Sequence, residues 1–151
     1  ENHGLPNVGM PYIKHVQEKI WEEEVVEVLK LGSIVLCGGL GCLGRYLLSG
    51  WVYKLFGGHF PYGTLAANIV GSFLLGLVME FSLHSTLIPM NLRIGITVGF
   101  LGGFTTFSTF SYETFKLLED GEILNAATNS VVSLLSCLLF IWLGISLARL
   151  I

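Results

Sequence analysis

The sequence predicts an all-α integral membrane protein with four transmembrane helices. Apolar residues make up 52% of the 151 residues and charged residues only 13%, whereas soluble domains carry about 25% charged residues. The apolar residues also gather into four long stretches that are nearly free of charge. A bilayer core about 30 Å thick is crossed by roughly 20 helical residues. Because every backbone polar group must be satisfied inside hydrocarbon, stretches of this length predict helices.

The four spans follow one another with short connectors between them. We place the first span at residues 31–53, where Arg45 is the only formal charge. The second span lies within residues 55–79 and begins near Pro61. The third and fourth spans cover residues 92–115 and 123–148. The connectors are residues 54–62, 84–91 and 116–122.

Residues 1–30 form an N-terminal extension in front of the four-span domain, residues 31–151. The chain opens without Met and without a signal-peptide pattern, so we expect its numbering to begin inside a longer protein. Apolar side chains recur in the extension at roughly helical spacing, at Ile13, Val16, Ile20, Val25, Val28 and Leu29. This pattern predicts an amphipathic helix that lies at the membrane interface or packs on the bundle. We interpret it as a solvated structural handle.

Charge and cysteine usage argue against several function classes. The net charge of −3 comes entirely from the extension, because residues 31–151 hold five Lys or Arg and five Asp or Glu. No basic patch indicates nucleic-acid binding, and the acidic extension does not favour anionic lipid. Cys37, Cys42 and Cys137 all lie in apolar runs. They therefore indicate packing rather than a disulfide or metal framework.

The sequence does not determine the orientation of the chain in the membrane. Three Lys or Arg lie near the helix ends on the N-terminal side, and three on the other side: Lys30, Arg93 and Arg149 against Arg45, Lys54 and Lys116. The positive-inside rule needs a clear excess on one side. A chain that inserts both ways is compatible with an antiparallel, dual-topology homodimer, a closed two-fold assembly.

The third span carries the most informative motif. Adjacent glycines followed by two threonines predict a helix broken at Gly102–Gly103. A break frees backbone carbonyls, which are hard oxygen ligands suited to a small cation. After the break, Phe107 and Phe110 share one helix face, interleaved with Ser108 and Thr109. A purely packed helix has little reason for such alternation of rings and hydroxyls.

Polar side chains also line one face of the second and fourth spans. Thr64, Asn68 and Ser72 stand four residues apart, and an Asn amide could cradle an anion with its two N–H donors. A weaker stripe in the fourth span consists of Asn129, Ser133 and Cys137. In the first span, Arg45 follows a glycine-rich stretch that favours close helix packing. Its guanidinium could snorkel, form a structural pair or attract an anion.

These motifs resemble the Fluc/CrcB family of fluoride channels. The resemblance covers residues 31–151 and is carried by residues 41–46, 62–76 and above all 102–111. It implies a passive fluoride-selective ion channel that exports fluoride across the cell membrane. It also implies an antiparallel homodimer with two pores and a structural sodium ion (Na+) at the dimer axis. The partners would then be fluoride, a second copy of the chain and the lipid bilayer.

The resemblance also implies a role for individual residues. Asn68 would be the pore amide, and Phe107 and Phe110 would present ring edges to the anion. Further hydroxyl and carboxyl groups would extend a polar track, at Thr64, Ser108, Thr109, Glu113 and Ser133. Backbone carbonyls of Gly102 and Thr105 would hold the sodium ion. Asn129 stands where relatives often carry Tyr, so whether Asn129 and Cys137 line the track is open.

Two other functions compete with this interpretation. A dual-topology small multidrug transporter also has four spans, but it needs a mid-membrane carboxylate, whereas Glu80 and Glu113 lie near span ends. A non-transporting membrane assembly subunit is the second alternative. We do not expect an enzyme, because no mid-span His or carboxylate could activate a serine nucleophile.

Overall fold

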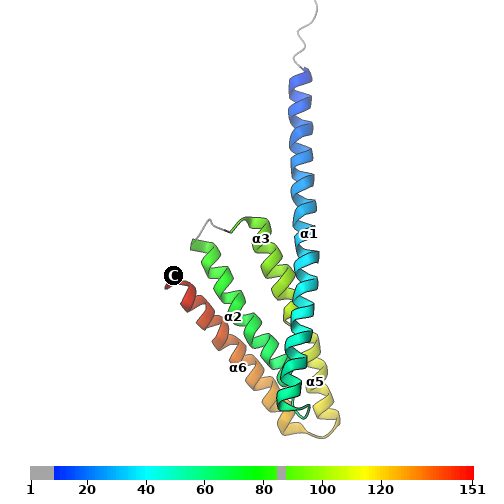
Figure 1. Ribbon diagram of the computed structural model, residues 1–151, viewed down its shortest axis with the longest axis vertical. Coiled ribbons are helices and arrows are strands. Elements are labelled where there is room, and N and C mark those ends of the chain that lie inside the picture. Colours follow the sequence, from blue (N-terminus) through cyan, green and yellow to red (C-terminus); the bar gives the residue numbers. More distant parts are fainter. Residues whose placement is uncertain (1–8, 85–87) are drawn as a thin grey trace, which may run out of the picture.

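The computed structural model describes residues 9–84 and 88–151, and this part of the chain is almost entirely helical (Figure 1). The elements are α1 (Gly9–Phe56), α2 (Tyr62–His84), α3 (Met90–Ile94), the π-helix η1 (Gly95–Leu101), α4 (Gly102–Phe104), α5 (Phe107–Glu119) and α6 (Ile123–Ala148). Four segments of the described residues are long and apolar enough to cross a membrane: Gln17–Phe56, Tyr62–Leu83, Met90–Glu119 and Ile123–Ala148. The prediction of four spans is therefore confirmed.

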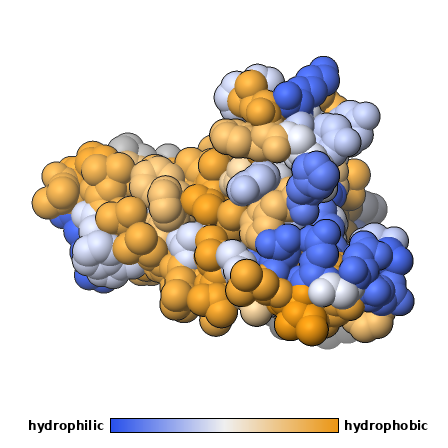
Figure 2. All heavy atoms as spheres, turned by 90° about the horizontal axis from the view of Figure 1, so that it is seen from below, coloured by the Kyte–Doolittle hydropathy of each residue, from blue (hydrophilic) through white to orange (hydrophobic). Residues whose placement is uncertain are grey.

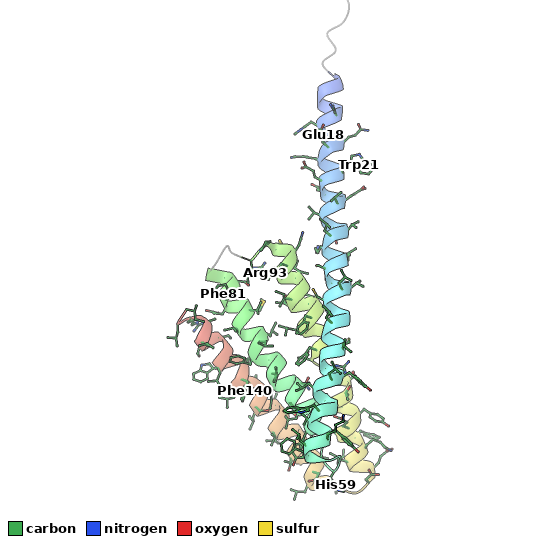
Figure 3. The ribbon with its side chains drawn as sticks, in the orientation of Figure 1. Glu18, Trp21, His59, Phe81, Arg93 and Phe140 are labelled. Carbon is green, nitrogen blue, oxygen red and sulfur yellow. The ribbon has the colours of Figure 1, made fainter. Side chains whose placement is uncertain are left out.

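Helix α1 contains residues 9–30 of the extension and the first span without interruption. Its 48 residues correspond to a rod of about 72 Å at 1.5 Å per residue. The N-terminal part continues along the α1 axis beyond the other helices instead of packing on them, and it carries Glu18 and Trp21 (Figures 1 and 3). The described side chains between residues 14 and 29 are all exposed.

The lower part of α1 packs against the third span through glycines on both sides. A Cβ atom at Gly99 would lie 2.9 Å from the Ile34 carbonyl oxygen, and one at Gly103 would lie 2.6 Å from that of Gly38. A Cβ atom at Gly41 would overlap the Phe100 carbonyl oxygen. Small residues at these positions let the two backbones approach closely, which is how membrane helices gain packing contacts.

Helices α2 and α6 lie side by side over much of their length (Figure 1). Gly76 contacts the Ile141 carbonyl, and Gly144 contacts the Phe73 carbonyl. At one end of the pair, Arg149 Nε donates to Glu80 Oε1 at 2.7 Å. The buried Glu80 carboxylate thus has a charged partner, as a carboxylate near a membrane span requires.

The helix break of the third span lies three residues after the predicted position, at Thr105–Thr106 instead of Gly102–Gly103. The backbone stays helical through Gly102, Gly103 and Phe104, so the prediction of a break at Gly102–Gly103 was wrong. Thr105 and Thr106 are extended instead, with φ/ψ of −86°/157° and −152°/116°.

Side-chain hydroxyls explain this position of the break. Thr106 Oγ1 accepts a hydrogen bond from the Thr109 N–H at 3.2 Å and so caps the N-terminus of α5. Thr is favoured as an N-cap because its hydroxyl replaces the missing backbone acceptor. Of the two glycines before it, Gly103 packs closely on α1, and neither interrupts the helix.

We expect Gly41→Ala to destabilise the bundle, because the added methyl group would overlap the Phe100 carbonyl. Overpacking of this kind costs about 1–3 kcal/mol. Gly39→Ala is the matched control, since a Cβ there has no heavy atom within 4 Å among the described residues. Thermal unfolding of the purified proteins in detergent should show a lower Tm for Gly41→Ala only. Equal Tm values would contradict this close approach of α1 and η1.

Candidate functional site

The helix break opens a groove between α2, the third span and α6. The groove has a volume of about 640 Å³ and is lined mainly by apolar atoms with a few polar groups. Its lining includes six of the residues predicted from the sequence: Asn68, Gly102, Thr105, Phe107, Phe110 and Ser133. Residues from three separate elements therefore meet where the third span is not helical.

Asn68 holds the extended residue Thr106 of the third span in place. Its Nδ2 donates to the Thr106 carbonyl at 3.0 Å, and its Oδ1 accepts from the Thr106 N–H at 2.8 Å. The side-chain amide thus pairs with the peptide groups of Thr106 from both sides. An amide nitrogen carries two N–H groups, and Thr106 takes one of them. The other is available to a ligand in the groove that Asn68 lines.

Phe107 and Phe110 form a ring pair at the start of α5. Their centroids are 5.4 Å apart and their planes are tilted by 42°. The Phe107 side chain is 79% exposed in the single chain, although it is one of the most apolar side chains of the groove. The edge of an aromatic ring carries the positive part of its quadrupole, so these rings can offer partial positive charge without an ionised group.

The carbonyls of Gly102 and Thr105 lose the donors that a continuous helix would supply. The N–H of Thr106 binds Asn68 instead of the Gly102 carbonyl. The N–H of Thr109 likewise binds the Thr106 hydroxyl instead of the carbonyl of Thr105. Both residues line the groove. Freed backbone oxygens are suitable ligands for a small hard cation, so these residues fit the sodium site expected from the family resemblance.

Arg45 reaches the break from α1. Its Nε donates to the Gly103 carbonyl oxygen at 3.2 Å. A cation at the C-terminal end of a helix interacts favourably with the carbonyl ends of the peptide dipoles. Of the three roles considered for Arg45, the geometry favours structural pairing.

A second set of polar residues lies on another side of the break. Thr64 Oγ1 donates to Glu113 Oε1 at 2.9 Å. Together with Thr109 and Arg45, these two residues line a separate cavity of about 470 Å³. In the described part of the chain, Glu113 Oε2 is buried without a hydrogen-bond partner, so this carboxylate keeps an open acceptor position.

A third cavity begins where the second ends, toward the connector between α1 and α2. It has a volume of about 460 Å³ and shares Thr64 and Glu113 with the second cavity. Its outer wall includes His59, which lies at the opposite end of the bundle from Arg93 (Figure 3). Seen from this end, the surface gathers hydrophilic side chains in one region beside a broad hydrophobic surface (Figure 2).

The residues predicted to form one polar track are therefore divided in the single chain. Asn68 and Ser133 line the groove, whereas Thr64, Thr109 and Glu113 line the other two cavities. Thr106, which the sequence analysis did not single out as a site residue, borders both sides. Ser108 is exposed, and its hydroxyl lies 3.2 Å from that of Thr106.

The fourth-span residues left open by the sequence are now placed. Cys137 lines the groove one turn after Ser133. Asn129 lies behind the groove wall and is only 2% exposed. It contacts Thr114 of α5, a residue that sequence reasoning missed because nothing marks which way α6 is rotated.

Comparison with known protein families agrees with the family resemblance of the sequence motifs. Residues 33–145 match the family model described as "CrcB-like protein, Camphor Resistance (CrcB)". The chain belongs to this family. With four candidate spans in the described residues, the CrcB-like chain is a multi-pass membrane protein.

Similar proteins match the CrcB-like chain over nearly their whole length. A protein of Geobacter metallireducens named fluoride-specific ion channel FluC is 65% identical over 122 residues, or 81% of this chain and 98% of that protein. A protein of the same name from Geotalea uraniireducens is 66% identical over 116 residues, or 77% and 94%. The one from Geobacter sulfurreducens is 58% identical over 117 residues, or 78% and 94%.

We expect Asn68→Leu to lower the Tm of the purified protein by several degrees. The substitution keeps the branched shape and the number of heavy atoms of the side chain but removes both hydrogen bonds to Thr106. Each buried polar group that loses its partner costs about 1–3 kcal/mol. Ser72→Ala, one turn further along α2 in the same groove, serves as the control. A Tm unchanged by Asn68→Leu would show that the pairing does not stabilise the break.

Proposed function

We propose that this protein is a passive fluoride-selective channel that exports fluoride across the cell membrane. The main support is the groove at the break of the third span, where an amide donor and two aromatic rings converge inside a membrane bundle. Relatives at 58–66% identity carry the name fluoride-specific ion channel. We extend that activity to this chain.

The donors of the groove suit a small, strongly hydrated anion. Fluoride leaves water only where positive partial charges replace its hydration shell. The free N–H of Asn68 and the edges of Phe107 and Phe110 supply such charges. A bare cation would bind the ion too tightly for conduction, whereas several modest sites allow it to leave. Arg45 is bonded to Gly103 and is not among the residues that line this groove.

The remaining polar residues extend the path in our proposal. Ser133 lies further along the groove. On the other side of Thr106, the exposed Ser108 and the cavity-lining Thr109, Thr64 and Glu113 continue toward the connector end of the bundle. This order predicts that the ion passes beside the two hydroxyl-rich cavities after it leaves the rings.

We further propose an antiparallel homodimer with two pores and a central structural sodium ion. Near-equal numbers of Lys and Arg at the two ends permit both insertions. The exposed Phe107 ring and the open groove leave apolar surface for a second copy to cover. Carbonyls of Gly102 and Thr105 from each copy would hold the sodium ion, which would lock the two breaks together.

The two alternative functions have less support. A proton-coupled multidrug transporter needs a free carboxylate in mid-membrane. Glu80 is paired with Arg149 at one end of its helix, and Glu113 accepts from Thr64 near the end of the third span. A non-transporting assembly subunit gives no reason for polar donors around a groove inside the bundle.

Fluoride efflux from liposomes tests the proposed function directly. Liposomes that contain the purified protein should release fluoride but not chloride, and they should do so without a proton gradient. We expect Phe107→Ile and Phe110→Ile each to reduce fluoride flux at least about tenfold, because Ile keeps the bulk but lacks the ring quadrupole. An apolar swap of similar volume usually costs less than about 1.5 kcal/mol, so the variants should still fold.

Phe100→Ile is the control for the ring substitutions. Phe100 stacks on Phe104 at 5.8 Å in the packed part of the third span, and neither ring lines the groove. Wild-type flux in both groove variants would contradict the ring-edge mechanism, while absence of fluoride release by the wild type would contradict the channel itself.

A thermal-shift titration tests the proposed sodium site. NaCl should raise the Tm of the detergent-purified protein above that in choline chloride at equal ionic strength. Ligands that bind only the folded state stabilise it in proportion to the logarithm of their concentration above Kd. The same Tm in both salts would argue against a sodium ion at Gly102 and Thr105.

A further inference from the structure

A chain of three hydrogen bonds lies behind the groove wall and joins α6 to α5. Ser133 Oγ and Asn129 Oδ1 are 3.3 Å apart, and Asn129 Nδ2 lies 2.8 Å from Thr114 Oγ1. Thr114 Oγ1 lies in turn 2.7 Å from the carbonyl oxygen of Phe110. The chain therefore begins at one residue that lines the groove and ends at the backbone of another.

The chemistry of these groups fixes the direction of every bond. The Phe110 carbonyl can only accept, so Thr114 must donate its single hydroxyl proton to it. The Thr114 oxygen can then only accept, and Asn129 must turn its N–H toward it. This leaves the Asn129 amide oxygen facing Ser133. Because that oxygen can only accept, Ser133 has to donate.

The direction of the chain matters for an anion in the groove. Ser133 lines the groove, and a serine hydroxyl has one proton and two lone pairs. Its proton is held by Asn129 on the far side of the wall. Ser133 therefore offers lone pairs rather than a donor to the groove, and lone pairs repel an anion.

We infer that Asn129 is a positioning residue that competes with the permeating anion for the hydroxyl proton of Ser133. The inference rests on the proposed function. When Ser133 turns its proton toward fluoride, Asn129 Oδ1 loses its partner at a site that is 2% exposed. An unsatisfied buried acceptor is unfavourable, so each such binding event is weakened. Asn129 thereby keeps this part of the path from holding fluoride too tightly, which favours release.

Two substitutions on different helices should release the proton of Ser133. Asn129→Leu removes the competing acceptor and keeps the branched shape and the number of heavy atoms of the side chain. Thr114→Val removes the group that orients Asn129, so that the amide can turn its N–H toward Ser133 and let Ser133 donate to the groove. Neither Asn129 nor Thr114 lines the groove itself. Both variants are expected to lower the half-saturating fluoride concentration by about tenfold, which corresponds to about 1.4 kcal/mol.

Asn129→Asp should act in the opposite direction. A carboxylate holds the Ser133 proton more strongly than an amide oxygen does, because hydrogen bonds to ionised acceptors are stronger. Its charge also disfavours an anion nearby. The half-saturating concentration should therefore rise. Asn125→Leu is the matched control, since Asn125 lies one turn earlier on α6, is exposed and bonds to Glu122.

The experiment measures initial fluoride efflux from liposomes as a function of fluoride concentration, for the full chain and each variant. A purely structural role of Asn129 would lower the maximal rate, through loss of folded protein, and leave the half-saturating concentration unchanged. In a Ser133→Ala background, the effect of Thr114→Val and of Asn129→Leu should vanish, because the contested proton is absent.

The outcomes separate this inference from the proposed function. If liposomes that contain the wild-type protein release no fluoride, the proposed function is contradicted, and the inference is contradicted with it. If they release fluoride but the half-saturating concentration is the same in Thr114→Val and Asn129→Asp, the inference alone is overturned. Persistence of the Thr114→Val effect without the Ser133 hydroxyl would overturn it as well. Should Asn129→Leu not fold, the conservative Thr114→Val and Asn129→Asp variants decide.

Discussion

The pairing of one side-chain amide with the backbone N–H and carbonyl of a single residue determines the architecture around the break. Asn68 of α2 satisfies both the N–H and the carbonyl of Thr106, at a depth where an unpaired backbone group is costly. Without it, an extended residue in the third span would be too unfavourable to persist. The freed carbonyls, the groove and the position of the two rings all follow from this local exception to helical structure.

The surrounding contacts stabilise the two halves of the third span and the helices packed beside it. Arg45 neutralises the carbonyl end of the first half of the third span, and the Thr106 hydroxyl caps the beginning of the second half. Glycines bring α1 against η1 on one side, while others bring α2 against α6. Specific polar pairs thus stabilise the break. The helix interfaces around it are close because they contain glycines.

The sequence predicted the spans well and the site only in part. Long uncharged stretches leave little choice of secondary structure inside a membrane. Helix α6, for example, covers the residues expected for the fourth span. The break was misplaced because glycines suggested flexibility. The hydroxyl of Thr106, which caps α5, and the pairing of the Thr106 backbone with Asn68, 38 residues away, decided the position instead. The burial of Asn129 depends on how α6 is rotated against α5, and sequence spacing does not contain that rotation. The extension looked separate because its polarity changes near residue 30, but nothing there interrupts a helix.

The unbroken α1 has a mechanical consequence. Its N-terminal part continues along the same axis beyond the bundle (Figure 1). A straight helix with no hinge acts as a lever, so a lateral force at its free end becomes a torque at its base. The base of α1 packs against the π-helix η1 and the glycines beside the break. The packed part of α1 is therefore the short arm of the lever. A displacement imposed beyond the bundle would therefore be delivered, reduced in amplitude and increased in force, to η1, whose residues Thr97 and Leu101 line the groove.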